Sequence, residues 1–499
     1  MNLYQIFRDR FEAHLDQPFL ISPGEAVCSY GDIDRLSACF AAALKQEDVN
    51  ALDRVVVQVD KSAGAVALYL ACLRIGAVYV PLNVAYTAAE VAYFLSDAAP
   101  TLFVCRPASA DQLYEVARQA GVPVTRTLGT SLDGSLGHVT HKLTPSVALT
   151  ERAPDDVAAM LYTSGTTGRS KGAMLTLENL ASNAVTLHKY WGFRPGDVLL
   201  HALPIFHVHG LFVALHCAML NASSVIFLPS FNTHEVRRAL ADATVMMGVP
   251  TFYTRLLDNE AFRREDCRNI RLFISGSAPL TEQTFTEFEQ RTGHRILERY
   301  GMTETNMITS NPLDGERVAG TVGYALPGIE VRVTSDSGEP LPPGELGSVE
   351  LKGPNVFTGY WRMPQKTAQE FRSDGFFITG DLGLLDPDGR LSLVGRSKDL
   401  IISGGYNIYP QEIESVIDAL PGVVESAVIG VPHPDFGESV IAVVVASKDQ
   451  AATEASIIEA TALQLARFKQ PRRVILVDEL PRNTMGKVQK NILRDRYGA

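Results

Sequence analysis

Glycines, hydroxyl groups and a lysine gather in one short segment that directly follows an apolar run: Thr163-Ser164-Gly165-Thr166-Thr167-Gly168-Arg169-Ser170-Lys171-Gly172. Glycine lets backbone N–H groups turn toward one anion, hydroxyls add further donors, and a lysine adds positive charge. The segment differs from a Walker A loop, because only two residues separate Gly165 from Gly168. It therefore predicts a phosphate-binding loop of another kind, although such a loop taken alone is more often a plain surface loop.

Further polar segments follow in the order that a nucleotide site would need. In the segment YGMTE (300–304), Thr303 can donate to a phosphate and Glu304 is an oxygen ligand suited to Mg²⁺. Asp381 ends the apolar run FFIT-Gly and could accept both hydroxyls of a ribose. Lys487 stands after a glycine in PRNTMGK. Taken singly, Asp381 could be a turn carboxylate and Lys487 a solvated surface lysine, which most lysines are.

Alternating strands and helices must position these segments. In the first 300 residues, short apolar runs such as RVVVQVD (54–60) and GAVYVPL (76–82) alternate with helical patterns such as SAGAVALYLACLR (62–74). This alternation is typical of parallel sheets covered by helices on both faces. After about residue 320, short alternating strands broken by Gly and Pro predict a small antiparallel barrel or sheet. Beyond GRSKD (395–399) the pattern predicts a separate α+β unit of about 100 residues.

Length and charge exclude several classes of protein. The chain has 499 residues, 46% of them hydrophobic and 20% charged, which is typical of folded globular proteins. Its net charge of −11 makes it a poor general partner for nucleic acid or an anionic membrane. Six cysteines without a CxxC pair indicate reduced thiols, and the charged N-terminus does not resemble a signal peptide. These features predict a cytoplasmic protein with small-molecule substrates, no transmembrane helix and no nucleic-acid or membrane partner.

Taken together and in this order, the motifs resemble those of the adenylate-forming enzymes, which include acyl-CoA synthetases, luciferases and peptide-synthetase adenylation domains. The resemblance covers essentially the whole chain. It implies an α/β fold with a large N-terminal part of two doubly wound subdomains and a β-barrel-like subdomain, followed by a small mobile α+β C-terminal domain. We therefore expect an adenylation domain over residues 1–397, a mobile domain over 399–499 and a hinge at Lys398, a position that is often Asp in the family.

The same resemblance implies the roles of the motif residues. ATP would be bound by Thr163, Ser164, Gly165, Thr166, Thr167, Gly168, Lys171, Gly276, Ser277, Ala278, Pro279, Tyr300, Gly301, Met302, Thr303, Asp381, Arg396 and Lys487. Within this set Thr163 to Gly168 and Lys171 would hold the phosphates, Thr303 would touch the α-phosphate, and Asp381 and Arg396 would take the ribose. Glu304 would bind Mg²⁺ and Lys487 would catalyse adenylation, and Thr303 and His207 are the other expected catalytic residues. The tunnel for coenzyme A would be bordered by Gly404, Gly405 and Tyr406.

The acyl site carries arginines where the family often has neutral residues. Arg299 directly precedes the YGMTE segment, and Arg255 lies in TFYTRLLDN. An arginine lining an acyl tunnel is costly unless it meets an anion, and its planar fork suits a carboxylate. Arg255 could instead lie on a solvated helix face, and Arg299 could pair with Glu298.

Longer segments resemble the malonyl-CoA synthetases: VPTFYTRLL, SGSAPL, LERYGMTETNMITSNP, KGPNVFTGYWRMP and LPRNTMGKVQKN. This resemblance implies ATP-dependent ligation of malonate to coenzyme A and a place in fatty acid metabolism. Arg299 and Arg255 would bind the second carboxylate, helped by Ser277 and His207. Methylmalonate, an aryl or other short- or medium-chain acid, or a nucleotide-binding role without catalysis stay open as alternatives. We expect a monomer or a weak homo-oligomer.

Overall fold

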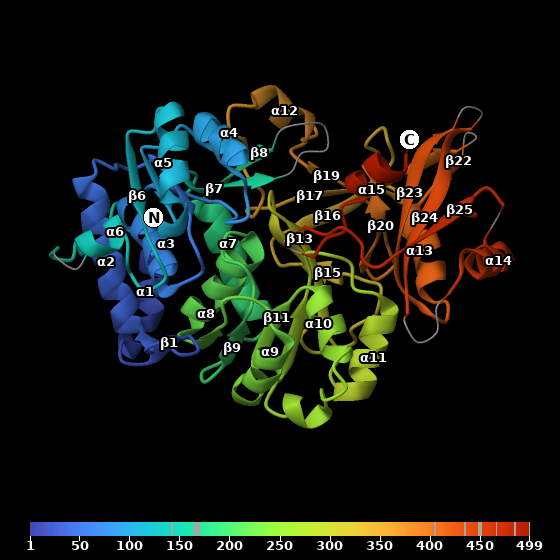
Figure 1. Ribbon diagram of the computed structural model, residues 1–499, viewed down its shortest axis with the longest axis horizontal. Helices are drawn as coiled ribbons and strands as arrows, with labels where there is room; N and C mark the ends of the chain where they lie inside the picture. The colour runs from blue at the N-terminus through green and yellow to red at the C-terminus, as the bar shows by residue number, and fades with distance from the viewer. Residues whose placement is uncertain are drawn as a thin grey trace.

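The computed structural model describes residues 1–140, 143–163, 170–403, 406–433, 436–447, 452–465, 467–483 and 486–498. Four sheets organise these residues, two of them large and mainly parallel, one antiparallel, and one in the C-terminal part of the chain. Figure 1 shows the two large sheets with their helices on one side and the C-terminal sheet on the other. The expected α/β fold with a small C-terminal α+β domain is confirmed. The Ser164–Gly168 part of the phosphate loop, and also Gly404 and Gly405, lie outside the described residues.

The first large sheet has seven strands in the order β18-β8-β7-β4-β3-β5-β6. Its central strands β7, β4, β3, β5 and β6 are parallel, and β8 and β18 add antiparallel pairs at one edge. The strands are β3 (Arg54–Gln58), β4 (Val78–Pro81), β5 (Leu102–Cys105), β6 (Val124–Thr127), β7 (Val157–Thr163), β8 (Lys171–Thr176) and β18 (Gly359–Tyr360). β7 ends at Thr163 and β8 begins at Lys171, so this hairpin brackets the predicted phosphate loop.

Helices cover both faces of this sheet, as the near-continuous apolar runs predict. Val56 packs with α4 (Ala88–Ala98) and α5 (Ala110–Gln119) on one face, whereas Val55 and Val57 point into the main core on the other. That core also contains buried residues from α1 (Leu3–Phe11), α2 (Tyr30–Gln46), α3 (Ala63–Ile75), α7 (Leu177–Tyr190) and α8 (His216–Asn221). The short helix α6 (Ser135–Thr140) contacts α2 and β6. Because α3 is apolar almost all round, it can only be stable inside the molecule.

The second large sheet has nine strands in the order β15-β14-β13-β12-β11-β9-β10-β1-β2. Its bounds are β1 (Pro18–Ile21), β2 (Cys28–Ser29), β9 (Val198–His201), β10 (Ser224–Phe227), β11 (Val245–Gly248), β12 (Leu272–Ser275), β13 (Leu297–Met302), β14 (Asn306–Ser310) and β15 (Tyr324–Ala325). The strands from β1 to β13 along this order are parallel. Helices α9 (Thr233–Ala239), α10 (Pro250–Leu257) and α11 (Glu282–Thr292) connect them. Loops that follow β9, β11, β12 and β13 therefore meet at one edge, where ligands bind in open parallel sheets.

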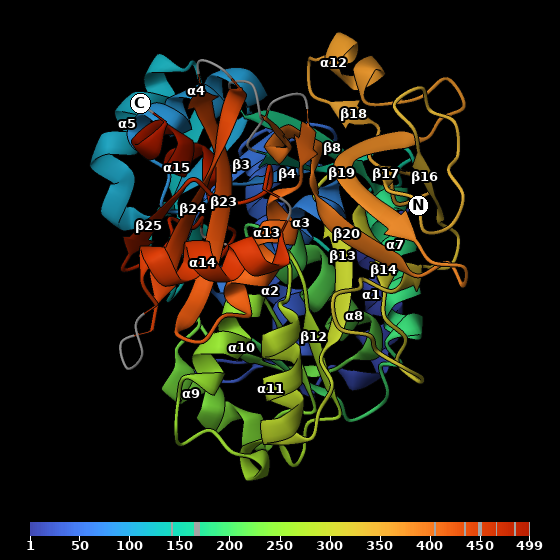
Figure 2. The same ribbon diagram turned by 90° about the vertical axis from the view of Figure 1, so that its right-hand side faces the viewer.

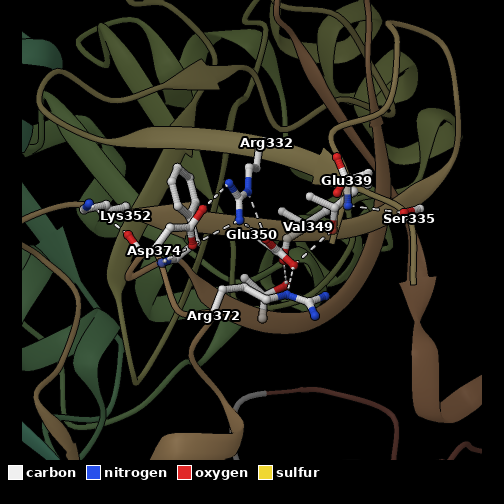
Figure 3. Close-up of polar contacts among 11 residues, drawn as sticks. Arg332, Ser335, Glu339, Val349, Glu350, Lys352, Arg372 and Asp374 are labelled. Carbon is white, nitrogen blue, oxygen red and sulfur yellow. Dashed lines mark hydrogen bonds and ion pairs between the residues drawn. The ribbon is translucent and has the colours of Figure 1, made fainter. Parts of the chain in front are cut away.

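The antiparallel region is a four-stranded sheet, where a barrel-like subdomain was expected. Its strands are β16 (Glu330–Thr334), β17 (Gly347–Lys352), β19 (Phe377–Leu385) and β20 (Leu391–Arg396), and α12 (Pro364–Gln369) precedes β19. Figure 3 shows Arg332 and Arg372 reaching the buried carboxylate of Glu350 from two sides, with N–O distances of 2.8 and 2.7 Å. Thr334 donates a further hydrogen bond of 3.0 Å to Glu350. A carboxylate with this many donors ties together β16, β17 and the segment that leads into β19.

The C-terminal residues form a sheet with two separate apolar faces. Its strands are β21 (Ile401–Ser403), β22 (Tyr406–Ile408), β23 (Val423–His433), β24 (Gly437–Ala446) and β25 (Arg473–Val477). Helices α13 (Pro410–Asp418) and α14 (Glu454–Gln464) cover one face, and α15 (Lys490–Tyr497) covers the other. Figure 2 shows this unit standing in front of the large sheets. Each face has its own small core, so the unit has the anatomy of a domain.

Two further expectations concern the chain as a whole. All six cysteines are free, and four of them are buried, as expected for reduced thiols. Among the described residues, no helix is long and apolar enough to span a membrane.

Candidate active site

The predicted ribose residues lie together where β19 and β20 pair. Asp381 and Arg396 are direct partners across the two strands, and the Nε atom of Arg396 lies 2.9 Å from Oδ1 of Asp381. The hydroxyl of Tyr300, at the end of β13, donates a short hydrogen bond to the other carboxylate oxygen. The backbone N–H of Asp381 donates a hydrogen bond of 3.0 Å to the hydroxyl of Thr379. A buried carboxylate fixed by these three groups can accept hydrogen bonds from the two hydroxyls of a ribose.

Glu304 lies at the mouth of the β7–β8 hairpin. Its Oε1 accepts hydrogen bonds from the hydroxyls of Thr163, at 3.3 Å, and Tyr360, at 3.0 Å. The ammonium of Lys171 lies 4.1 Å from the centre of the Tyr360 ring and 3.7 Å from a carboxylate oxygen of Glu370. Thr163, at one end of the phosphate loop, thus contacts the carboxylate predicted to bind a metal, although the two residues are 141 positions apart. Lys171, at the other end, contacts the ring of Tyr360, whose hydroxyl binds Glu304.

The donor set around Glu304 fits a magnesium ion that is shared with a substrate. Within the described parts of the chain, no three His, Cys, Asp or Glu side chains cluster as a metal site. Mg²⁺ is commonly held by one or two carboxylates together with substrate phosphates and water. Glu304 beside a phosphate loop suits that mode of binding, and Thr303 in the adjacent turn is half-buried.

The segment Gly276–Pro279 follows β12 directly and runs beside Tyr300 on the neighbouring strand β13. Ser277 adopts a left-handed conformation with φ of 73°, which is uncommon for a residue with a side chain. Its hydroxyl lies 3.2 Å from Nδ1 of His209. Non-glycine residues held in this conformation often occur at binding sites.

Arg299 lies against Gly276 of this segment, and its guanidinium has no ion-pair partner among the described residues. Only 2% of the residue is exposed, and neither Nε nor one terminal nitrogen of the guanidinium has a hydrogen-bond partner. Burial lowers the pKa of Arg299 to about 9, so the group stays charged at neutral pH. A buried unpaired charge is strongly destabilising, and a bound anion would satisfy it.

Glu298 is not the partner of Arg299. The two residues are neighbours on β13, so their side chains point to opposite faces of the sheet. Oε1 of Glu298 instead accepts a hydrogen bond of 3.1 Å from the backbone N–H of Leu280. Burial raises the pKa of Glu298 to about 8, although the Leu280 amide and Arg299 lower it. Burial therefore favours the protonated form of Glu298, and its carboxylate forms no ion pair with Arg299 among the described residues.

Two histidines complete the surroundings of Arg299. Burial, together with the charge of Arg299, lowers the pKa of His207 to about 4 and that of His209 well below its usual value. His209 opens the π-helix η3 (His209–Leu215), a rare element that is frequent at functional sites. Its Nε2 atom is buried without a hydrogen-bond partner. Both rings are neutral at neutral pH, so they add no further positive charge beside Arg299 and can bind a ligand through hydrogen bonds.

Arg255 lies elsewhere. Helix α10 buries Phe252, Tyr253, Leu256 and Leu257, whereas Arg255 is exposed in its last turn. The structure therefore favours the alternative of a solvated helix face for Arg255. Its i−4 neighbour Thr251 lies on the same side of the helix.

Lys487 reaches this site from the C-terminal domain. A Cβ added to Gly486 would lie 2.8 Å from the Thr251 hydroxyl of α10, so the loop before Lys487 touches the large domain. Burial and the charge of Arg396 lower the pKa of Lys487 to about 8, while Asp381 raises it. No hydrogen bond or ion pair to its ammonium is found among the described residues. A free cation beside Asp381 and Arg396 can meet a phosphate.

The remaining predicted residues lie at the junction of β20 and β21, at the start of β22, and beside β12 and β13. Lys398 stands in the single turn η6 (Ser397–Asp399), which joins β20 to β21. Burial, followed by the charge of Arg396, lowers the pKa of Lys398. Tyr406 begins β22, on the far side of the undescribed residues 404 and 405. Gly301 and Met302 end β13 beside Tyr300, and Ala278 and Pro279 follow Ser277.

Sequence reasoning missed three side chains of this site: His209, Tyr360 and Glu298. His209 could have been found, because the segment PIFHVHG places two histidines two residues apart. Glu298 was considered only as an ion-pair partner of Arg299. Tyr360 lies in the quoted segment KGPNVFTGYWRMP, but its contact with Glu304 had no local signal, since only the fold brings β18 to Glu304.

Comparisons with known proteins agree with this geometry. The model of the AMP-binding enzyme family matches residues 7–361, and that of the AMP-binding enzyme C-terminal domain matches residues 412–487. The mitochondrial malonate–CoA ligase of Mus musculus is 35% identical over 509 residues, covering 95% of this chain and 85% of that protein. ATP-bound MatB from Rhodopseudomonas palustris is 53% identical, with a TM-score of 0.96 over 100% of this chain and 99% of that chain. The apo form, 52% identical over the same shares, gives a TM-score of 0.85, so the present arrangement is closer to the ATP-bound one.

Proposed function

The chain belongs to the family of AMP-binding enzymes, and on this premise we propose that it ligates malonate to coenzyme A at the expense of ATP. In the first step a malonate carboxylate oxygen attacks the α-phosphorus of ATP, and pyrophosphate leaves. In the second step the sulfur of coenzyme A attacks the acyl carbon of malonyl-AMP, the thiol proton is lost and AMP leaves. The products are malonyl-CoA, AMP and pyrophosphate.

The unpaired guanidinium of Arg299 is the observation on which the choice of malonate rests. Malonate has two carboxylates, so one can react while the other meets Arg299. A monocarboxylate such as acetate or benzoate would leave this buried charge without an anion. His207 and Ser277, both close to Arg299, would donate hydrogen bonds to the same carboxylate.

Lys487 would catalyse the first step. Two anions, the carboxylate and the triphosphate, must approach each other, and cations held in place reduce their repulsion. The ammonium of Lys487 lies close to Asp381 and Arg396, the proposed ribose site. It can therefore neutralise charge that develops between the α-phosphate and the carboxylate.

The nucleotide would be held by the residues of the motifs. Asp381 and Arg396 would bind the ribose. The segment Gly276–Pro279 with Tyr300, Gly301 and Met302 would line the adenine, Thr303 would contact the α-phosphate, and Lys171 with the loop 163–168 would bind the β- and γ-phosphates. Glu304 would hold Mg²⁺, which supplies positive charge to the phosphates when it is bound.

The second step would require the small domain to move. Lys487 lies close to Asp381 and Arg396 in the present arrangement, so it would have to withdraw before the thiol can approach the acyl-adenylate. Lys398 lies between β20 and β21, where few residues join the two domains. We infer that rotation there brings Gly404, Gly405 and Tyr406 to border the coenzyme A tunnel.

An assay of AMP release with ATP, coenzyme A and a panel of acids tests this function. Malonate should be the best substrate among malonate, methylmalonate, succinate, acetate and benzoate. Methylmalonate keeps both carboxylates and differs by one methyl, which discriminates by only ~1–3 kcal/mol, so it is the alternative to compare most closely. Equal activity with acetate and malonate would contradict the proposal, and no AMP release with any acid would contradict ligase activity itself.

The proposal extends to the cellular location, the oligomeric state and the metabolic role of the enzyme. We propose a cytoplasmic enzyme that acts as a monomer or weak homo-oligomer on small molecules and supplies malonyl-CoA to fatty acid metabolism. Light scattering over a range of concentrations would test the oligomeric state, and a stable large assembly would contradict it.

A further inference from the structure

The peptide unit that joins Gly486 to Lys487 is held at both its oxygen and its nitrogen. The guanidinium of Arg482 donates a short hydrogen bond to the carbonyl oxygen of Gly486. On the other side of the peptide, the backbone N–H of Lys487 donates a hydrogen bond of 2.9 Å to Oδ1 of Asn483. Gly486 itself has φ of 74°, so this turn has a defined left-handed conformation. The direction in which the Lys487 side chain leaves the backbone is therefore set by Arg482 and Asn483.

Arg482 is anchored in turn to the body of the small domain. A second terminal nitrogen of its guanidinium forms a short ion pair with Glu425 on β23. Because a guanidinium is planar and carries several donors in a fixed fork, one arginine can hold Glu425 and the Gly486 carbonyl at the same time. A lysine at position 482 would have a single nitrogen and no such fork.

The far side of the same loop is tied down independently. Nζ of Lys490, the first residue of α15, lies 2.5 Å from Oε1 of Glu414 on α13. The carboxylate of Glu414 also accepts a hydrogen bond of 2.7 Å from the backbone N–H of Val428 on β23. The loop that carries Lys487 is thus anchored on both sides of Lys487. Among the described side chains that hold the peptide unit next to Lys487, Arg482 is the one that also pairs with β23, through Glu425.

We propose that Arg482, held by Glu425, is a positioning residue that aims Lys487 into the adenylation site. This inference rests on the proposed function, in which Lys487 serves the first step. The amine of Lys487 has no partner of its own among the described residues, so its location depends on the backbone that carries it. A displacement of about 1 Å in a group that must meet a reacting centre can cost ~100-fold in rate.

Separate measurement of the two half-reactions distinguishes a positioning role of Arg482 from a general effect on folding. Arg482→Met should slow the release of pyrophosphate from ATP and malonate at least tenfold. It should leave the conversion of preformed malonyl-AMP and coenzyme A to malonyl-CoA within about twofold of the wild type. Glu425→Gln keeps the shape of the anchor without its charge, so it should show the same selective loss to a smaller degree. A loss shared equally by both half-reactions, or no loss in the first, would overturn the proposal.

A double-substitution cycle with Lys487 tests the route by which Arg482 acts. If Arg482 works by aiming Lys487, then adding Arg482→Met to Lys487→Ala should change adenylation by less than twofold. The same factor in both backgrounds would show that Arg482 acts by another route, which contradicts the proposal. Lys469→Met and Glu412→Gln are matched controls, because they break a charged pair of 2.6 Å in the same domain, away from the Lys487 loop. Both controls should leave both half-reactions unchanged.

The same measurements distinguish a failure of the positioning role of Arg482 from a failure of the proposed function. If the wild type forms no adenylate from malonate, or Lys487→Ala adenylates at the normal rate, the proposed function fails. If the wild type and Lys487→Ala behave as expected but Arg482→Met is normal, only the positioning role fails.

Discussion

The guanidinium of Arg299 lies against Gly276: a Cβ added to that glycine would stand 2.6 Å from Cζ of Arg299. Carbon atoms cannot approach so closely, so the arginine occupies its present position only because residue 276 has no side chain. The glycine lies in the segment that follows β12, and the arginine lies on the neighbouring strand β13. The absence of a side chain on one strand thus makes room for the charge on the next.

Gly276→Ala should therefore displace Arg299. Overpacking of this kind typically costs ~1–3 kcal/mol, and the displaced guanidinium would bind the distal carboxylate of malonate less well. We expect the ratio of kcat/KM for malonate to that for acetate to fall about tenfold or more. Any effect on adenine binding is common to both acids and cancels in this ratio. An unchanged ratio would mean that Arg299 does not depend on Gly276 for its position.

Lys487→Ala should impair the first half-reaction and spare the second. Loss of one group that stabilises developing charge commonly costs ~10²–10³ in rate. The variant should form little malonyl-AMP from ATP and malonate, but it should convert supplied malonyl-AMP and coenzyme A to thioester at close to the normal rate. Rapid-quench measurement of each half-reaction checks this, and equal damage to both would refute the division of labour.

The depressed pKa of Lys487 predicts the pH dependence of adenylation. Burial and Arg396 lower this pKa to about 8, and only the protonated amine is a cation. The fraction of active enzyme therefore falls as the pH rises through about 8, so kcat/KM for ATP should decline on that limb. Bound phosphates favour the ammonium, so the decline of kcat should begin at higher pH. Lys487→Arg, which stays charged, should lack the limb; if it keeps the same limb, another group is titrating.

Lys398→Pro should stop the small domain from rotating. Proline fixes φ near −65° and removes a backbone N–H, so a residue that must change its backbone angles can no longer do so. We expect adenylation to survive, because the present arrangement already places Lys487 at the site, while thioester formation fails. Formation of malonyl-CoA at the normal rate by the proline variant would show that the hinge lies elsewhere.

Much of the fold and of the nucleotide site follows from local sequence. Alternating apolar runs predicted parallel sheets, and the family resemblance implied a shared ribose site for Asp381 and Arg396, which are partners across β19 and β20. Contacts between side chains that lie far apart in the sequence were harder to predict. Nothing local indicates that Lys171 approaches Glu370, because the two are 199 positions apart and α12 brings them together.

For the arginines predicted in the acyl site, the periodicity of strand and helix predicts which way each side chain points, but it does not predict the contacts made with other elements. A period of two along β13 places Glu298 and Arg299 on opposite faces, and a period of 3.6 along α10 leaves Arg255 outside. Both outcomes could have been derived from the sequence. The hydrogen bond of Glu298 could not be predicted from the sequence, because its partner, the amide of Leu280, lies in a loop that follows another strand.

The ratio of kcat/KM for malonate to that for acetate in Arg299→Ala tests the central claim most directly. Removing an arginine that pairs with a buried carboxylate should cost ~2–5 kcal/mol, which is about thirtyfold or more in kcat/KM for malonate. Acetate makes no such contact, so its weak turnover and the KM for ATP should stay close to the wild type. Arg255→Ala, which removes an exposed arginine on α10, is the matched control and should leave the ratio unchanged. If Arg299→Ala folds, as shown by its melting temperature, and keeps the wild-type ratio, Arg299 does not recognise the second carboxylate and the assignment of malonate is contradicted.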